Sequence, residues 1–282
     1  SYRLTPPSWR PQNRDDGRPL TAHDLFARPE TPPILANETG RLLRYQDGSW
    51  TSVAGLVSGG SPAFSVTALH QDLVWILSSN RAIQFSLTQN TVIQSIPVPD
   101  PENMYLDHLY QDKKGRLFLY GFSGVYESVQ GKWQRLPVVG QGEKPHFVLS
   151  MSQDAAGDLW FGLQGEFQHR TQNETERFIL RDIDSAFSEN DPVTSICLRK
   201  NGQLWFGTYT EGLLCLENGA FRRITSRDGL IGNRVTALFE SSDETLWVGT
   251  RSTGVSSYRD GHWISYTTTD GLSNYRVLTF GE

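Results

Sequence analysis

A motif built around an aromatic residue recurs along this chain at nearly constant spacing. Residues 202–212 read GQLWFGTYTEG and residues 244–254 read ETLWVGTRSTG, which places Trp205 and Trp247 42 residues apart. Weaker copies precede them at intervals of 45, 42 and 43 residues and centre on Trp160, Phe118 and Trp75. A sixth copy at residues 34–36 continues the series. Because a repeat of roughly 20–50 residues is the signature of solenoids and propellers, this period constrains the fold more than any local pattern does.

Each repeat contains four short strand patterns. Residues 235–239 form an apolar run, residues 246–250 read LWVGT, and two further runs end at Tyr258 and Tyr266, with polar turns between them. The turns recur at equivalent places and carry Gly48, Gly115, Gly131, Gly202, Gly219 and Gly261. Glycine adopts positive φ at little cost, which suits it to such corners. Four strands joined by tight turns predict one antiparallel sheet per repeat.

Both faces of each sheet are predicted to be packed. Neighbouring side chains of a strand point to opposite faces, yet Leu204, Trp205 and Phe206 are all apolar. Eight Trp, fourteen Phe and ten Tyr favour strands, and 26 Gly with 14 Pro supply turns. Sheets arranged radially cover one another. We therefore predict an all-β fold, a β-propeller of four-stranded antiparallel blades, with the tryptophans filling the gaps between blades.

The repeats predict one domain spanning residues 1–282. Six blades are expected at about 20–57, 62–98, 103–138, 145–180, 190–226 and 232–268. Residues 1–12 are expected to supply outer strands of a further blade, and residues 274–280 its inner strand. Seven units of about 42 residues need more than the 282 residues of the chain. We therefore predict seven blades with one incomplete, and a six-bladed ring with flanking extensions is the alternative.

The best-matching repeats also carry a family signature. Residues 204–208 read LWFGT, Asp228 opens an Asp-Gly-Leu segment followed by Asn233, and Asp270 opens a second one followed by Asn274. With these residues the chain resembles the two-component regulator propeller family (Reg_prop). The resemblance implies a periplasmic sensor region, placed before a membrane helix and an output module such as a histidine kinase or a diguanylate cyclase. It also implies a ligand, because relatives often sense carbohydrates, although a fold alone does not determine function.

Composition and motifs exclude several classes of function. The net charge is -5 and no run of five or more Lys and Arg occurs, so nucleic acid is not an expected partner. No apolar stretch approaches the roughly 18 residues that cross a bilayer, and the chain opens with Ser1, so we expect a part of a longer protein. No nucleophile elbow, phosphate-binding loop or nucleotide fingerprint is present, and we expect neither catalytic residues nor a cofactor.

Candidate ligand-binding residues come from two sets of loops. In a four-stranded blade, the loop before the inner strand and the loop between the second and third strands open on the same face. These loops carry Asn233, Arg234, Asn274, Tyr275, Arg276, Tyr209, Arg251 and His146, with Asn103, Tyr105, Gln164, Glu166 and Glu211 in the wider set. Their aromatic faces, amides and guanidinium groups suit sugars or carboxylated oligosaccharides. A purely structural role is the alternative, in which the asparagines cap turns and Arg234 pairs with an acid of the next blade.

Metal ions and disulfides are not expected. The six histidines are scattered without a close pair of ligand spacing, so zinc is not predicted. Asp182, Asp184, Glu189 and Asp191 crowd into one loop, which suits calcium or, more simply, a solvated acidic loop. Cys197 and Cys215 fall in the first and third strands of one blade, almost 10 Å apart at about 4.8 Å per strand. Two buried free thiols are therefore predicted.

Three functions of different class remain open. The first is a sensor that binds a small molecule or an oligosaccharide on the funnel face and works with an output signalling domain. The resemblance implies that a homodimer is one of its possible states. The second is a scaffold that binds another protein. The third is a lyase or glycoside hydrolase built on a propeller, which would require converging acids or a perturbed histidine in the central funnel.

Overall fold

The residues that the structure describes form six four-stranded antiparallel sheets, each built from consecutive strands. The computed structural model describes residues 22–28, 31–37, 42–46, 49–53, 63–68, 72–78, 80–99, 106–138, 147–272 and 274–280. Sheet 1 contains β1 (Ala22–Arg28), β2 (Thr31–Asn37), β3 (Leu42–Gln46) and β4 (Ser49–Ser52). Sheet 2 contains β5 (Ala63–Ala68), β6 (Leu73–Ser78), β7 (Arg81–Ser86) and β8 (Thr91–Pro97). Sheet 3 contains β9 (Leu106–Gln111), β10 (Leu117–Gly121), β11 (Gly124–Val129) and β12 (Lys132–Leu136).

The second half of the chain repeats this pattern. Sheet 4 contains β13 (Ser150–Gln153), β14 (Leu159–Gly162), β15 (Glu166–Arg170) and β16 (Thr175–Ile179), and the one-turn helix α1 (Leu180–Ile183) follows it. Sheet 5 contains β17 (Val193–Leu198), β18 (Leu204–Thr208), β19 (Leu213–Glu217) and β20 (Ala220–Ile224). Sheet 6 contains β21 (Val235–Glu240), β22 (Leu246–Thr250), β23 (Val255–Arg259) and β24 (His262–Tyr266). Short 3-10 turns, η1 (Ser226–Asp228) and η2 (Thr268–Asp270), follow sheets 5 and 6.

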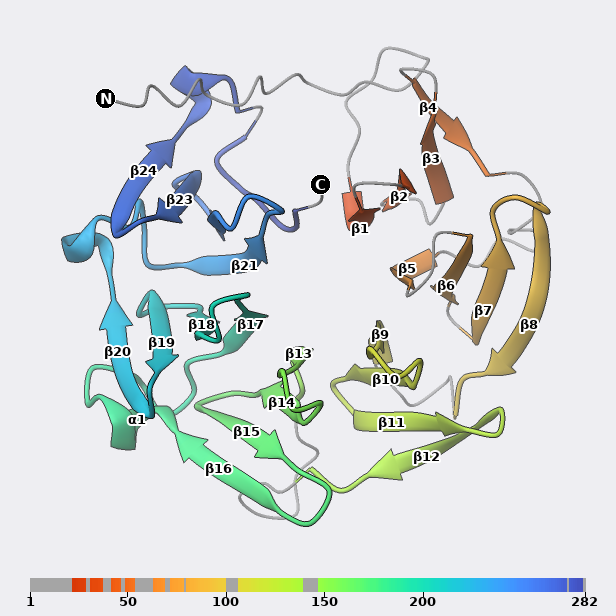
Figure 1. Cartoon of the computed structure of the whole chain (residues 1–282), viewed down its shortest axis with the longest axis horizontal. Helices are drawn as coiled ribbons and strands as arrows, with labels where there is room; N and C mark the ends of the chain where they lie inside the picture. Colours follow the sequence, from red (N-terminus) through yellow and green to blue (C-terminus); the bar gives the residue numbers. More distant parts are fainter. Residues whose placement is uncertain are drawn as a thin grey trace.

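The six sheets stand radially around a central opening, with the first strand of each sheet innermost (Figure 1). The all-β fold and the four-stranded antiparallel units predicted from the repeats are thus confirmed. Tight turns join the strands as expected. Asn218 and Gly219 have φ values of 51° and 78°, and Asp260 and Gly261 have 51° and 81°, which are the paired positive values of a type I′ hairpin turn. The predicted turn at Gly48 lies outside the described residues.

Hydrophobic side chains fill the spaces between neighbouring sheets. Trp205 is fully buried and belongs to a cluster that joins Leu213 of its own sheet to Val235 and Val248 of sheet 6. Equivalent clusters join sheets 2 and 3, sheets 3 and 4, and sheets 4 and 5. Burial of one such large side chain contributes about 1.5–3 kcal/mol. The expectation that both faces of a sheet are packed is therefore confirmed for sheets 3, 4 and 5, each of which takes part in two of these clusters.

The glycine of the LWFGT motif allows the next sheet to approach. A Cβ atom at Gly207 would lie 2.6 Å from Val235 Cγ1, and one at Gly162 would lie 2.8 Å from Val193 Cγ1. Real Cβ atoms do not show such contacts. Glycine is required here because the inner strand of the following sheet passes directly over this position, and no other residue leaves room for it.

Residues 274–280 take the place of the next inner strand without forming one. Val277 N donates to Thr250 O at 3.0 Å, as Val193 N does to Leu163 O at 2.9 Å two sheets earlier. A Cβ at Gly249 would also meet Val277 Cγ1, at 2.9 Å. The predicted strand at 274–280 is nevertheless not assigned, because no described strand pairs with this segment. Residues 1–12 lie outside the described residues, so a seventh blade stays a prediction.

Candidate functional site

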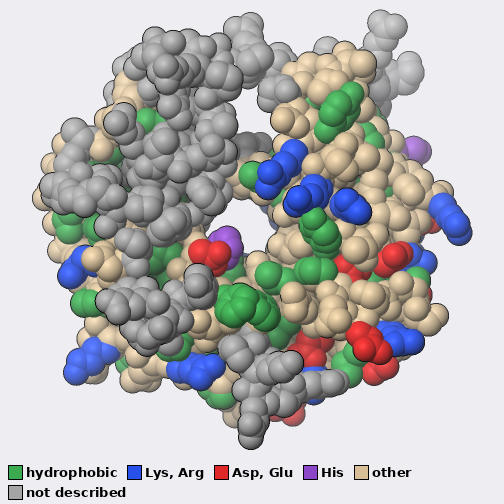
Figure 2. Space-filling view, turned by 180° about the vertical axis from the view of Figure 1, so that it is seen from behind, with side chains coloured by type: hydrophobic (Ala, Val, Ile, Leu, Met, Phe, Trp, Pro, Cys, Tyr) green, Lys and Arg blue, Asp and Glu red, His purple; other side chains and the backbone are tan. Residues whose placement is uncertain are grey.

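Tyr209, Arg234 and Arg251 come together on the face where the candidate loops open. Tyr209 follows β18, Arg251 follows β22, and Arg234 precedes β21. Arg251 N donates to Arg234 O at 2.9 Å, and the Arg251 guanidinium carbon lies 5.6 Å from the centroid of the Tyr209 ring. This cation–π contact links sheets 5 and 6. Lys and Arg side chains gather beside the central opening in the view of Figure 2.

The arginines of this face keep their charge available. Arg234, Arg251 and Arg276 are exposed, and among the described residues no carboxylate lies within 4.0 Å of any of them. Other arginines of the chain are paired, such as Arg223 with Glu211 at 3.0 Å. The alternative that Arg234 pairs with an acid of the next sheet finds no partner in the described part of the chain. A group of unpaired guanidinium ions is suited to bind an anionic ligand.

The two asparagines of the signature have structural partners. Asn233 Oδ1 accepts a hydrogen bond from Ser226 N at 2.8 Å, and Asn274 Oδ1 accepts one from Arg276 N at 3.0 Å. Their amide oxygens are therefore occupied by backbone groups, as the structural alternative predicted. The asparagine side chains order the loops that carry the arginines, because each fixes the backbone next to one of them.

Tyr275 lies at the edge of the same face. Its side chain is 44% exposed, its hydroxyl accepts a hydrogen bond from Thr268 Oγ1 at 2.8 Å, and its carbonyl accepts one from Gly254 N at 3.0 Å. The segment 274–280 is thus fixed to the loop after β22. His146, Asn103 and Tyr105, which were predicted for this face, lie outside the described residues.

A buried carboxylate holds the loop that presents Tyr209. Asp191 is 1% exposed and accepts hydrogen bonds from Thr210 Oγ1 at 2.6 Å and Thr210 N at 3.0 Å. Burial raises the pKa of Asp191, and the hydrogen bonds from Thr210 oppose this effect. The acidic loop is therefore only partly solvated, and Asp184 is paired with Arg223 at 2.8 Å.

Glu166 is not a loop residue, contrary to the prediction. It begins β15 and is buried, where its carboxylate pairs with Arg177 and accepts a hydrogen bond from Gln168 Nε2 at 2.7 Å. The isolated bridge between Gln164 and Pro192 shortens the preceding loop, which places Glu166 inside the sheet.

Two aromatic residues on this face were not predicted from the sequence. Phe122, in the loop between β10 and β11, is 45% exposed and packs edge to face against Phe147, just before β13. Phe122 lies four residues after Phe118, as Tyr209 and Arg251 lie four residues after Trp205 and Trp247. Counting from the aromatic of the motif would have found it.

Both cysteines are free, as predicted. Trp205 pairs with Cys197 on one side and with Cys215 on the other, so a strand separates the thiols. Cys215 is buried, whereas Cys197 is half-buried, which corrects the expectation of two fully buried thiols. Burial raises the pKa of Cys197 to about 12 and that of Cys215 to about 11.

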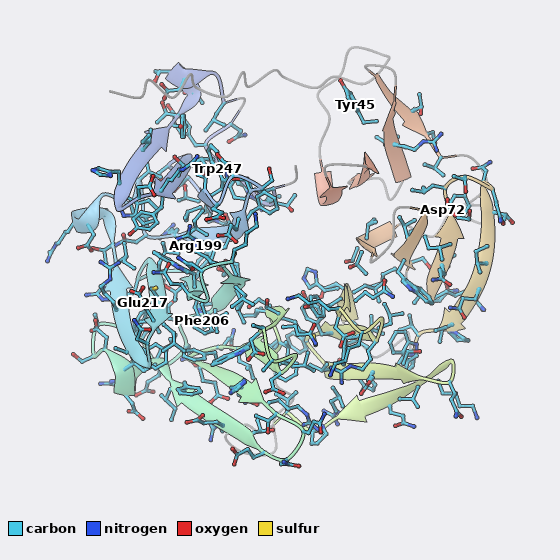
Figure 3. The ribbon with its side chains drawn as sticks, in the orientation of Figure 1. Tyr45, Asp72, Arg199, Phe206, Glu217 and Trp247 are labelled. Carbon is cyan, nitrogen blue, oxygen red and sulfur yellow. The ribbon has the colours of Figure 1, made fainter. Side chains whose placement is uncertain are left out.

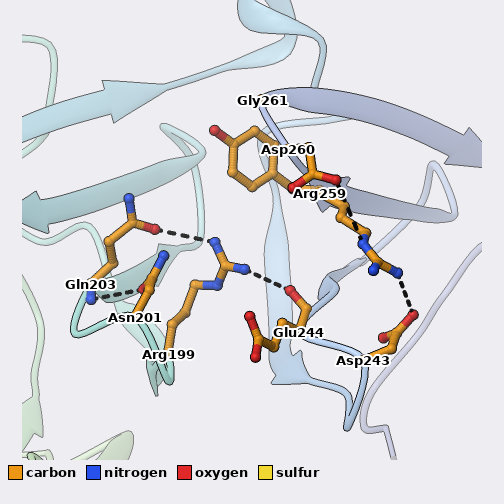
Figure 4. A pocket seen from close by; sticks show the side chains of 9 residues that line it. Arg199, Asn201, Gln203, Asp243, Glu244, Arg259, Asp260 and Gly261 are labelled. Carbon is orange, nitrogen blue, oxygen red and sulfur yellow. Dashed lines mark hydrogen bonds and ion pairs between the residues drawn. The ribbon is translucent and has the colours of Figure 1, made fainter.

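A hollow of about 260 Å³ lies between sheets 5 and 6, at the turns after β17, β21 and β23. Figure 3 locates Arg199 between these sheets, where it forms an ion pair with Glu240 at 3.1 Å; both side chains are 8% exposed. Within the hollow Arg199 also donates to Gln203 Oε1 at 3.2 Å, and Arg259 pairs with Asp243 at 2.9 Å (Figure 4). Because these charges are satisfied internally, the hollow is a weaker candidate site than the arginine-bearing face.

Comparison with known families identifies the repeats. The family described as two component regulator propeller matches residues 188–210 and 229–252, which include the LWFGT and LWVGT strands. The chain carries two-component regulator propeller repeats. A search of curated proteins gave no significant match. In the part of the chain that the structure describes, no helix has the length and apolarity needed to cross a membrane.

Solved structures share the fold of these regulator propeller repeats at low sequence identity. The extracellular domain of a B. thetaiotaomicron protein described as a hybrid two-component system superposes with a TM-score of 0.75 at 17% identity, over 92% of this chain and 36% of that one. A second such domain from B. thetaiotaomicron gives a TM-score of 0.59 at 15% identity, over 94% and 43%. The chain thus spans less than half of these domains. A streptogramin B lyase gives 0.71 at 11% identity, over 92% and 86%. These similarities identify the fold as a β-propeller.

Proposed function

We propose that this chain is a ligand-sensing, non-catalytic domain in the extracytoplasmic part of a bacterial signal-transduction receptor. Its ligand, a carboxylated oligosaccharide or a similar small anion, binds on the face that carries Arg234, Arg251 and Arg276. The observation that carries the proposal is that, among the described residues, none of these three guanidinium groups has a carboxylate within ion-pair distance. The periplasmic location and the output domain rest on the repeat family and on the extracellular domains that share the fold.

The chemistry of the face favours an anionic sugar over a neutral one. A guanidinium group binds a carboxylate through two parallel hydrogen bonds, and a tyrosine ring packs against the apolar face of a pyranose. Tyr209 and Arg251 are held in one orientation by their mutual contact and by Asp191 below the loop. Such preorganisation lowers the entropic cost of binding, because the site is ordered before the ligand arrives.

A thermal-shift screen followed by calorimetry tests the proposal. The panel contains mono- and oligosaccharides, uronic acids and amino acids, with trigalacturonate and neutral maltotriose as the matched pair. We expect a carboxylated compound to raise the melting temperature, because a ligand that binds only the folded state stabilises it by mass action. Arg251→Ala should weaken binding about tenfold or more, which corresponds to about 1.4 kcal/mol.

Arg222→Ala is the matched control, because Arg222 is equally exposed but lies on the outer strand β20. It should bind like the parent chain. If Arg251→Ala and Arg222→Ala bind equally well, or if maltotriose binds as tightly as trigalacturonate, the proposed site is wrong.

A protein-binding propeller is the second candidate. The exposed Phe122 and its partner Phe147 put an apolar surface on the same face, and aromatic anchors are typical of protein interfaces. Absence of any hit in the small-molecule panel would favour this function. Turnover of a panel compound would instead support an enzyme, against which the internal pairing of Glu211 and Asp191 argues.

A further inference from the structure

Three positions around the aromatic of the motif can be compared in sheets 3 to 6. Two of them precede the aromatic by six and by two residues, and the third faces it across the strand pair. Sheet 3 has Asp112, Arg116 and Glu127 at these positions, sheet 4 has Asp154, Asp158 and His169, sheet 5 has Arg199, Gln203 and Cys215, and sheet 6 has Ser241, Thr245 and Ser257. The repeats can therefore be compared position by position.

In sheet 3 a cation lies between two acids. Arg116 Nε is 2.6 Å from Asp112 Oδ2, and Arg116 Nη1 is 3.9 Å from Glu127 Oε1. The Asp112 side chain is fully buried. The arginine compensates both carboxylates, which is what a partly buried pair of acids requires.

In sheet 4 the first acid is kept as Asp154, but the arginine is gone. Asp158 replaces the arginine and His169 replaces the glutamate, so two carboxylates converge on one imidazole. His169 Nε2 is 3.1 Å from Asp154 Oδ2 and 3.9 Å from Asp158 Oδ2, and these atoms all lie within 4.8 Å of one another. All three side chains are half-buried, and among the described residues neither acid has a Lys or Arg within ion-pair distance.

We propose that Asp154, Asp158 and His169 bind a divalent first-row cation such as Zn²⁺ or Mn²⁺. Ligand atoms that each lie about 2.1 Å from one ion are about 3.0–4.2 Å apart, which agrees with the observed separations. The neutral imidazole, with its proton on Nδ1, offers its Nε2 lone pair, and the ion replaces the contact between Nε2 and Asp154. Mixed carboxylate and imidazole ligands suit these metals better than Mg²⁺.

The surroundings orient the three ligands. Trp160 Nε1 donates to Asp154 Oδ2 at 3.0 Å, Asp158 N donates to Asp154 Oδ1 at 3.0 Å, and the Trp160 ring stacks on His169 with centroids 4.2 Å apart. In metal sites, hydrogen bonds and packing of this kind hold the side chains that bind the metal in a fixed orientation. A groove of about 430 Å³ reaches the cluster at Asp158, and Lys114 and Arg170 also line it.

The test uses the untagged chain after treatment with EDTA, titrated by calorimetry with Zn²⁺ and, separately, with Mn²⁺. We expect one saturable site for at least one of these metals and a rise in melting temperature when it is bound. His169→Gln and Asp158→Asn should each weaken binding at least tenfold. Far-UV circular dichroism establishes that each variant is folded.

His262→Gln and Asp260→Asn are the matched controls, because this second histidine and aspartate lie close together on the exposed turn between β23 and β24. They should titrate like the parent chain. The proposal is overturned if neither metal binds saturably, or if folded His169→Gln binds as well as the parent. Co²⁺ provides an independent readout, since its visible absorption should change when His169 is removed.

Discussion

The substitution Gly207→Ala tests the radial packing, because the packing determines whether the substitution raises or lowers the free energy of unfolding. Gly207 does not have positive φ, and in an open strand the change would stabilise the protein by about 0.4–1 kcal/mol because it restricts the unfolded chain. Here the new Cβ would lie 2.6 Å from Cγ1 and 3.3 Å from Cβ of Val235, and it would also meet Ser195 Oγ. Val235 is fully buried and has no room to retreat. Overpacking of this kind costs about 1–3 kcal/mol.

Urea unfolding followed by far-UV circular dichroism measures the effect, with the free energy of unfolding extrapolated to water. Gly207→Ala should unfold at lower urea than the parent chain. Val235→Ala removes one of the two close contacts, the one with Cγ1, and leaves the one with Ser195 Oγ. The double variant should therefore be more stable than the sum of the single effects by about 0.5 kcal/mol or more. Gly202→Ala is the control, because its Cβ meets nothing within 4 Å and should combine additively with Val235→Ala. A stabilising Gly207→Ala would refute the close approach of sheets 5 and 6.

Three further predictions follow from single groups. Hydrogen bonds from the N-cap residue of η1 hold the pKa of Asp228 below its ordinary 3.8, so Asp228→Asn should destabilise by about 0.5–1 kcal/mol at pH 7. Because a lowered acid pKa contributes stability that is lost as pH falls through it, urea curves of the two proteins should converge below about pH 4. Because its thiol is buried and its pKa is raised, Cys215 should react with a disulfide reagent at pH 8 only after unfolding, and fast labelling of this thiol in the native protein would contradict its burial. The raised pKa of the half-buried Cys197 should likewise make its labelling slow in the native protein. Arg199→Met should cost about 3 kcal/mol by leaving Glu240 buried without its cation, and replacing Glu240 by Leu as well should recover most of it in the same urea assay.

The architecture could be predicted because it depends on positions that every repeat shares. Trp205 and Gly207 carry two requirements of the same interface, since the first fills the space toward sheet 6 and the second lets Val235 approach. Both requirements appear in the sequence as a residue type at a fixed spacing, so the repeated sheets could be predicted from the sequence alone. The helix α1 was not predicted, because four residues between two strands contain no periodic pattern.

The candidate site could be predicted only in part. Topology alone puts Tyr209 and Arg251 on one face, and the structure adds that their side chains touch. The sequence could not show which charged side chains form ion pairs, because ion pairing depends on distances between side chains of different strands. Glu166 looked like a loop acid until Arg177 and the bridge at Gln164 placed it within the sheet.

The sequence did not point to the proposed metal-ligand cluster for a related reason. His169 lies 15 residues from Asp154, and a search for local ligand spacing does not connect them. The antiparallel register does, because Trp160 pairs with His169 while its indole donates to Asp154. Comparison of equivalent positions shows the same cluster, because the acids of sheet 4 lack the arginine that compensates the acids of sheet 3. In a repeat protein, the positions that keep one residue type build the ring, so function has to reside where equivalent positions differ. Two such places are the loop position that holds Phe122, Gln164, Tyr209 and Arg251 and the cross-strand position that holds Glu127, His169, Cys215 and Ser257. Arg251 of the proposed ligand-binding face occupies the first, and His169 of the proposed metal site occupies the second.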